Sequence, residues 1–219
     1  MTAAKQLDLP PVTFDEYVEF ERNSNVRHEI QGGVLVAMAG GRIEHDDVGD
    51  NFRRKFGKAY EAGGCRPNSG DVMVYLAGHD KGAYPDATVT CGEREFREEK
   101  DPDERRVLLN PTLVVEVLSP STAMYDMKDK LDGYLSIPSL RQVVLADPTT
   151  PWVRVITRTE TGFSAVTVTD MAATVELESI RVSVSMAEIY FNVKTTPASR
   201  ISQANASVVD LSGGEVAGL

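Results

Sequence analysis

The sequence has little of several residue types that often mark a functional class. It contains two cysteines, three histidines and one tryptophan in 219 residues. Cys65 and Cys91 lack the paired spacing of a zinc site, and two cysteines alone are weak evidence for a disulfide, so we predict two reduced thiols. No apolar run approaches the roughly 20 residues of a membrane-spanning helix, and residues 1–11 lack the apolar core of a signal peptide. These absences predict a soluble, cytoplasmic protein without a membrane partner.

Positive charge is also scarce. The chain has 33 acidic and 23 basic residues, which gives a formal net charge of -10. This balance excludes a broad electrostatic attraction to nucleic acid, so any contact with DNA or RNA requires a local basic patch or a metal ion. The densest positive cluster consists of Arg53, Arg54, Lys55 and Lys58. It is either a solvated helix face or a phosphate contact, and the sequence leaves both open.

Hydrophobic periodicity predicts the order of the elements. A capping box at Thr13 and Glu16 predicts a first helix, and the glycines at 32–33 predict a hairpin turn between two short strands. Apolar residues at every fourth position from Val48 to Tyr60 predict a second helix over residues 43–62. Several strands, a helix over 126–137, further strands and a last helical turn follow. This order predicts an α+β fold with a mixed β-sheet flanked by helices, not a doubly wound fold.

The hydrophobic content allows one full core. At 42% hydrophobic residues, we expect residues 1–194 to form a single domain. Residues 195–219 are small, polar and unpatterned, so we predict a disordered tail there.

Two carboxylates stand out because each accompanies a strongly apolar run. Asp86 follows Tyr84 and Pro85 at the start of one predicted strand, and Glu116 interrupts the apolar run of another. A carboxylate buried in such a strand is costly without a partner. Two carboxylates on neighbouring strands predict a site for Mg²⁺ or Mn²⁺, which prefer oxygen ligands. The alternative is that both are strand-end residues paired with arginines.

A lysine that could assist such a site lies on the next predicted helix. Leu118, not lysine, shares the strand face of Glu116. Asp126, Lys130 and Tyr134 are four residues apart and share one helix face, so Lys130 is the candidate. The alternative for Lys130 is a solvated helix residue, and Tyr134 is predicted to pack in the core.

From about Phe14 to Asn192 the chain resembles the Uma-two family of bacterial proteins, a branch of the PD-(D/E)XK restriction-endonuclease-like superfamily. Single motifs of this set are common, but their combination in this order is specific. The motifs are Phe14-Asp15-Glu16-Tyr17, His28-Glu29-Ile30-Gln31-Gly32-Gly33, Met38-Ala39-Gly40-Gly41 followed by His45, Tyr84-Pro85-Asp86, Glu116 to Thr122, and Asp126 to Lys130 with Tyr134.

The resemblance implies a restriction-endonuclease-like core with an added N-terminal helix and hairpin and added C-terminal strands. It implies that Asp86 and Glu116 are metal ligands, with the carbonyl of Val117 as a third. Lys130 matches a catalytic lysine that this branch carries on the following helix. Glu29 matches an additional acidic catalytic residue.

The resemblance assigns no role to His45, and we expect His28 at the surface. The leading hypothesis is a Mg²⁺-dependent endonuclease that acts on nucleic acid, with DNA favoured and a homodimer expected by analogy. The second is a binding or regulatory protein that retains the nuclease fold without cleavage, which the acidic net charge and Leu118 favour. The third is a metal-dependent hydrolase of another phosphoester. The retained carboxylates and Lys130 favour the first.

Overall fold

The computed structural model describes residues 6–7, 13–31, 34–38, 42–61, 63–98, 107–118 and 124–196. The glycines at 32–33 and 40–41, the motif residues 119–122 and the tail beyond residue 196 lie outside the described residues. The helices are α1 (Phe14–Asn23), α2 (Ile43–Glu61), α3 (Met124–Leu135) and α4 (Met186–Ile189), with a 3₁₀ turn η1 (Glu178–Ile180). The strands are β1 (Gln6–Leu7), β2 (His28–Gln31), β3 (Val34–Ala37), β4 (Cys65–Ser69), β5 (Met73–Leu76), β6 (Lys81–Ala83), β7 (Ala87–Cys91), β8 (Val107–Leu108), β9 (Leu113–Val117), β10 (Gln142–Ala146), β11 (Val153–Arg158), β12 (Phe163–Val168), β13 (Thr174–Leu177) and β14 (Val182–Ser185).

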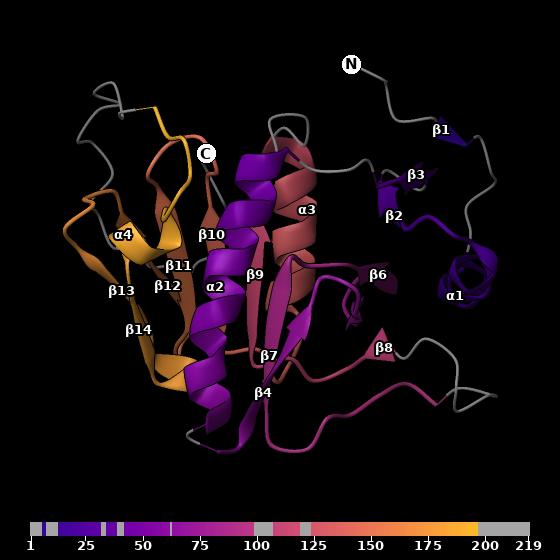
Figure 1. Cartoon of the computed structure of the whole chain (residues 1–219). Coiled ribbons are helices and arrows are strands. Elements are labelled where there is room, and N and C mark those ends of the chain that lie inside the picture. The colour runs from indigo at the N-terminus through magenta and orange to yellow at the C-terminus, as the bar shows by residue number, and fades with distance from the viewer. Residues whose placement is uncertain are drawn as a thin grey trace.

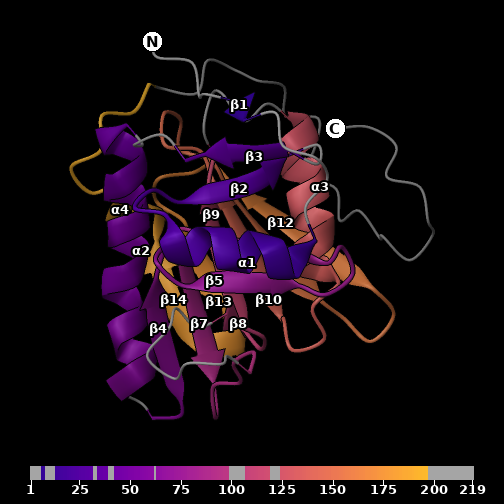
Figure 2. The ribbon, with the colours of Figure 1, turned by 90° about the vertical axis from the view of Figure 1, so that its right-hand side faces the viewer.

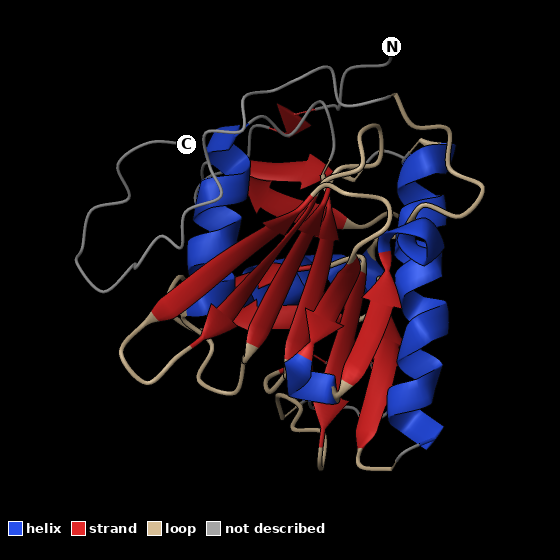
Figure 3. Ribbon diagram, turned by 90° about the vertical axis from the view of Figure 1, so that its left-hand side faces the viewer, coloured by secondary structure: helices blue, strands red, loops and turns tan. Residues whose placement is uncertain are grey.

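A six-stranded sheet in the order β12-β11-β10-β9-β7-β4 forms the centre of the molecule (Figure 3). Strands β9 and β10 are parallel, and the other neighbouring pairs in this sheet are antiparallel. The predicted α+β fold with a mixed sheet is therefore confirmed. The predicted hairpin before and after Gly162 is the pair β11–β12.

Helices cover both faces of this sheet, with α2 on one face and α3 on the other (Figure 1). The alternation of side chains along β9 divides its residues between two hydrophobic clusters. Leu113, Val115 and Val117 pack with α2, whereas Val114 packs with Tyr134 of α3. Complete burial of a side chain such as Phe52 or Phe56 of α2 contributes about 1.5–3 kcal/mol each. This packing fixes the positions of both helices relative to the strand ends.

The apolar stripe predicted for α2 is wrong at its last member. Val48, Phe52 and Phe56 are completely buried, but Tyr60 is 60% exposed and Ala59 is buried instead. A spacing of four residues rotates each successive side chain by about 40° around a helix of 3.6 residues per turn. By Tyr60 the accumulated rotation has moved the side chain off the buried face.

The N-terminal segment forms a separate layer beside the sheet (Figure 2). Helix α1 begins at the predicted capping box, in which Thr13 Oγ1 accepts from the backbone N–H of Glu16 at 3.3 Å. Strands β2 and β3 pair as an antiparallel hairpin, and β5 pairs with β6 and β8 in a small sheet. Phe14, Tyr17 and Val18 of α1 form a hydrophobic cluster with residues of β3, β5 and β8. The added helix and hairpin are therefore packed onto the core.

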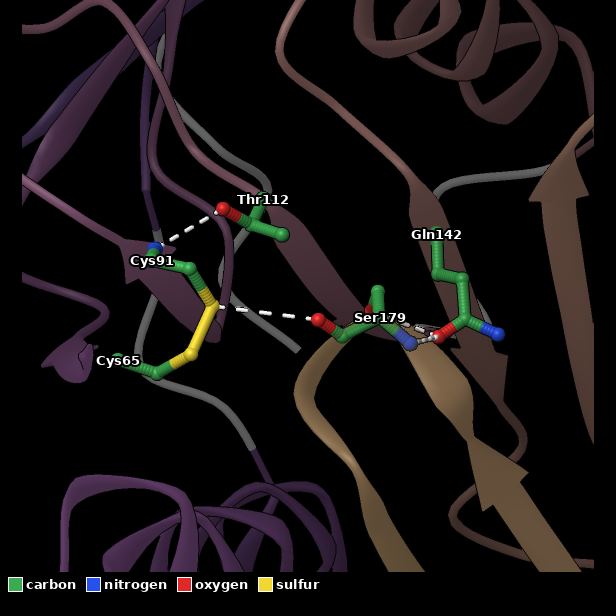
Figure 4. The surroundings of a disulfide bond; sticks show 5 residues. All are labelled: Cys65, Cys91, Thr112, Gln142 and Ser179. Atoms are coloured by element: carbon green, nitrogen blue, oxygen red, sulfur yellow. Dashed lines mark hydrogen bonds between the residues drawn. A yellow bond between two sulfur atoms is a disulfide. The ribbon is translucent and has the colours of Figure 1, made fainter. Parts of the chain in front are cut away.

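The prediction of two reduced cysteines is wrong, because Cys65 and Cys91 form a disulfide in the structure (Figure 4). The two residues lie directly opposite each other in the antiparallel pair β4–β7. The backbone N–H of Cys91 donates to Thr112 Oγ1 at 2.9 Å, and its Sγ lies 3.9 Å from the carbonyl oxygen of Ser179. Their opposition depends on a strand register that cysteine spacing does not reveal.

Over the residues that the structure describes, none of the helices combines the length and the apolar character needed to cross a bilayer.

Candidate active site

Asp86 and Glu116 lie across from each other at one end of the central sheet. Asp86 lies in the bend directly before β7, and Glu116 is the fourth residue of β9. The register pairs Ala87 with Val115, and extension by one residue places Asp86 opposite Glu116. The carboxylate of Asp86 also bridges the strands, because its Oδ2 accepts from the N–H of Val117 at 2.7 Å. The predicted proximity of the two carboxylates is thus present in the structure.

Glu116 is buried, with 4% of its surface exposed, and α3 supplies its partners. The Tyr134 hydroxyl donates to Oε1 of Glu116, and the Lys130 ammonium lies 3.0 Å from the same oxygen. Tyr134 packs in the core as predicted, and its hydroxyl contacts the site as well. No arginine pairs with Glu116 among the described contacts, so the predicted alternative of an arginine partner does not hold for this residue.

Lys130 connects Glu116 to the N-terminal layer. Its ammonium donates to Oε1 of Glu29 on β2 at 2.8 Å, and the Lys130 side chain is 20% exposed. The alternative of a solvated helix lysine is therefore excluded. The structure brings together all four predicted catalytic side chains, Glu29, Asp86, Glu116 and Lys130, although the chain separates them by up to 101 residues. The side chain of Asp126 lies outside the described residues.

One face of α2 approaches Asp86 from the other side of the sheet. His45, Gly49 and Arg53 are four residues apart and share this face. His45 Nε2 lies 3.6 Å from Asp86 Oδ2, and Arg53 Nη1 donates to the main-chain carbonyl of Asp86 at 2.8 Å. A Cβ atom added at Gly49 would lie 3.8 Å from Cβ of Asp86, so the missing side chain permits this close approach. His45, which the sequence left without a role, lies beside the site.

The predicted basic cluster does not act as a unit. Arg53 contacts Asp86 and also pairs with Asp50, whereas Lys55 Nζ pairs with Glu188 of α4 at 2.5 Å. Arg54 and Lys58 are exposed on the helix. Only Arg53 of the four therefore lies at the carboxylates, and no pattern in the sequence separates it from its neighbours.

The site concentrates negative charge. Burial raises the pKa of Glu116 to about 7, against the opposing positive charge of Lys130. Burial also raises the pKa of Asp86, although His45 and the N–H of Val117 oppose this shift. Burial alone would lower the pKa of Lys130, but Glu116 and Glu29 outweigh burial and raise it above its ordinary value. The three carboxylates thus lie near two side chains with a permanent positive charge, Lys130 and Arg53, and Arg53 also pairs with Asp50. An additional cation would relieve the repulsion between the carboxylates.

The available donors suit a hard divalent cation that needs few protein ligands. Among the described residues, no three His, Cys, Asp or Glu side chains converge as a complete metal-binding set. Asp86 and Glu116 provide two carboxylates, and the carbonyl of Val117 lies on the same edge of β9 as the N–H that contacts Asp86. Mg²⁺ commonly uses one or two carboxylates and completes its coordination with water and substrate phosphates. The residues therefore fit Mg²⁺ better than a metal that requires a closed protein cage.

Several known proteins are similar to this chain in sequence or in fold. The uncharacterized protein slr1290 of Synechocystis is 28% identical over 182 residues, which cover 83% of this chain and 93% of the relative. The uncharacterized protein sll1609 of the same organism is 26% identical over 136 residues, or 62% of this chain and 75% of the relative. The crystal structure of a protein from Anabaena variabilis, described as a "putative nuclease belonging to DUF820", superposes with a TM-score of 0.66 at 17% identity. That match covers 82% of this chain and 98% of the Anabaena chain.

The structural match confirms the restriction-endonuclease-like fold. The model of the Uma2 family, described as "Putative restriction endonuclease", matches residues 14–187, which is well over half of the chain. The chain therefore belongs to the Uma2 family of restriction-endonuclease-like proteins.

Proposed function

We propose that this protein is a Mg²⁺-dependent nuclease that hydrolyses phosphodiester bonds, with DNA as the favoured substrate. The observation that carries the proposal is the opposition of Asp86 and Glu116 at the start of β7 and the end of β9, with Lys130 in contact with Glu116. Membership in a family described as "Putative restriction endonuclease" supports nucleic acid as the substrate class. Mn²⁺ is the expected substitute for Mg²⁺, because both prefer carboxylate and water ligands.

Each residue of the site has a proposed part. Asp86, Glu116 and the carbonyl of Val117 would hold the metal ion, which when bound lowers the pKa of a water molecule and neutralises charge on the phosphate. Lys130 is within reach of Glu116 and would contact the phosphate or orient the attacking water. Glu29 holds the Lys130 ammonium in this position.

The decisive experiment is a calorimetric titration with Mg²⁺ and with Mn²⁺, followed by a cleavage assay. The wild type should bind one of these ions, and Asp86→Ala combined with Glu116→Ala should abolish binding. Glu176→Ala is the matched control, because Glu176 is an exposed strand carboxylate on β13. Supercoiled plasmid, single-stranded DNA and RNA then identify the substrate. A wild type that binds neither metal at millimolar concentration, with and without DNA, would refute the proposal.

A non-cleaving binding protein is the second candidate function. Leu118 stands where the superfamily usually has its lysine, and the net charge of -10 disfavours a broad nucleic-acid surface. This candidate predicts metal binding without cleavage of any nucleic acid. The third candidate is a metal-dependent hydrolase of another phosphoester, and a small substrate such as bis(p-nitrophenyl) phosphate tests it. Hydrolysis of this substrate without cleavage of DNA or RNA would support the third candidate.

A homodimer stays a prediction, and light scattering after size exclusion would measure it. The cytoplasmic location also stays a prediction.

A further inference from the structure

A buried polar network lies behind the site, between α1 and the segments that carry two of its carboxylates. Glu21 on α1 is 2% exposed, on a face that otherwise carries the apolar or aromatic residues Phe14, Tyr17 and Val18. A carboxylate at such a position is costly unless hydrogen bonds satisfy its oxygens. Its partners therefore indicate what the residue does.

The two oxygens of Glu21 contact different segments. Oε1 lies 2.8 Å from Nδ1 of His28, and Oε2 accepts from the Tyr84 hydroxyl at 2.9 Å. His28 is 6% exposed, so the expectation that it lies at the surface is wrong. The Tyr17 hydroxyl donates to the His28 carbonyl at 2.5 Å, and the His28 ring packs edge-on against Phe20 at 4.9 Å. The His28 side chain and backbone are thus both held.

Both partners of Glu21 lie within two residues of a carboxylate of the site. His28 precedes Glu29, and Tyr84 precedes Pro85 and Asp86. The N–H of Tyr84 also donates to Oε1 of Glu29 at 3.4 Å, which joins the two segments. Proline has a fixed φ angle and restricts the backbone of the residue before it, so a displacement of Tyr84 is passed on to Asp86.

We propose that Glu21 is a positioning residue, which through His28 and Tyr84 sets the positions of Glu29 and Asp86 relative to each other. The purpose of this positioning rests on the proposed function, but the positioning itself is measurable without it. The competing explanation is that Glu21 only stabilises the packing of α1.

The test compares Tyr84→Phe with Tyr190→Phe. Both tyrosines are 4% exposed, and the Tyr190 hydroxyl donates to the carbonyl of Asp147 at 2.9 Å, among the C-terminal elements. Three quantities are measured: the amide resonance of Val117 in metal-free protein, the Mg²⁺ affinity, and kcat separately from KM on DNA. The Val117 resonance reports on Asp86, because its N–H donates to that carboxylate at 2.7 Å.

Tyr84→Phe and Glu21→Met should shift the Val117 resonance and lower Mg²⁺ affinity or kcat by about 10–100-fold, as is typical when a group that orients a ligand is lost. Glu21→Gln should retain most of the wild-type behaviour, because its amide can bond both His28 and Tyr84. Tyr190→Phe should lose stability and leave the Val117 resonance in place.

An unchanged Val117 resonance in Tyr84→Phe, with a stability loss like that of Tyr190→Phe, would overturn the positioning role. Should Glu21→Met fail to fold, Tyr84→Phe decides alone. A wild type without Mg²⁺ binding would refute the proposed function, and the Val117 resonance would still judge the positioning role.

Discussion

Glu116 shows how one buried carboxylate joins the core to the chemistry of the site. It lies in a strand whose other residues are apolar, and it is satisfied by a hydroxyl and an ammonium from α3. A buried charge with such partners is weak evidence for stability, because the cost of desolvation offsets the attraction. Its presence in a buried strand is better explained by function.

Tyr134→Phe tests the contact that holds Glu116. The change removes only the hydroxyl that donates to Oε1 of Glu116. We expect the folded protein to retain its core packing and to lose about tenfold in Mg²⁺ affinity, as for other groups that orient metal ligands. Calorimetric titration measures the affinity, with Tyr190→Phe as the control for loss of a buried hydroxyl. Equal affinity in wild type and Tyr134→Phe would show that Lys130 alone orients the carboxylate.

The raised pKa of Glu116 predicts a pH dependence of stability in metal-free protein. Its pKa is about 7 in the folded state and 4.5 as the unperturbed value, so the folded state retains a proton that the unfolded state has lost between these values. The free energy of unfolding should therefore fall as pH rises from about 4.5 to 7, by at most about 1.4 kcal/mol per pH unit, and level off above.

Urea unfolding at several pH values in a chelator measures this term as the difference between wild type and Glu116→Gln. Glutamine keeps the shape and does not titrate. A difference that is constant between pH 5 and 8 would contradict the raised pKa.

At the scale of elements, α2 and α3 divide the site between them. Helix α3 supplies the partners of Glu116, and α2 supplies His45 and Arg53 beside Asp86. The two helices lie on opposite faces of the sheet (Figure 1), and Asp86 and Glu116 lie where β7 begins and β9 ends. The distance between α2 and the start of β7 therefore decides the geometry at Asp86.

Two glycines of α2 test this distance. A Cβ at Gly57 would meet nothing within 4 Å, whereas one at Gly49 would lie 3.5 Å from Arg53 Nη1 and 3.8 Å from Asp86 Cβ. Alanine fits at both positions and should stabilise the helix by up to about 1 kcal/mol. Leucine should be tolerated at Gly57, but at Gly49 it must displace Arg53 or Asp86 and should abolish Mg²⁺ binding. Thermal unfolding and calorimetry measure both pairs of variants, and equal metal affinity in the two leucine variants would refute the close approach.

At the scale of the whole molecule, much of the site could be predicted because its residues break a local pattern. A carboxylate in an apolar strand is visible in the sequence, and so is a lysine at helical spacing from a tyrosine. The burial of Glu21 and His28 was not visible, because each satisfies the other through a contact between different elements. Strand β4 was missed as well, because Arg66, Pro67 and Asn68 give a sheet-edge strand no apolar alternation.

Because β4 was not predicted, the pairing of Cys65 with Cys91 was not predicted either. The disulfide leads to a prediction about the edge of the sheet. Cys65 and Cys91 are separated by 26 residues, so closing this loop should stabilise the fold by about 3–4 kcal/mol. Urea unfolding of the wild type with a reductant should therefore match the variant Cys65→Ala with Cys91→Ala, and the reductant should not affect that variant. Asp86 directly precedes β7 at its opposite end, about 17 Å along the strand from Cys91 at 3.3 Å per residue. Mg²⁺ affinity should consequently be equal in both redox states. Labelling of both thiols confirms that the wild type has been reduced. If the urea midpoint of this reduced protein equals that of the oxidised wild type, hydrogen bonds and packing alone hold β4 on the sheet.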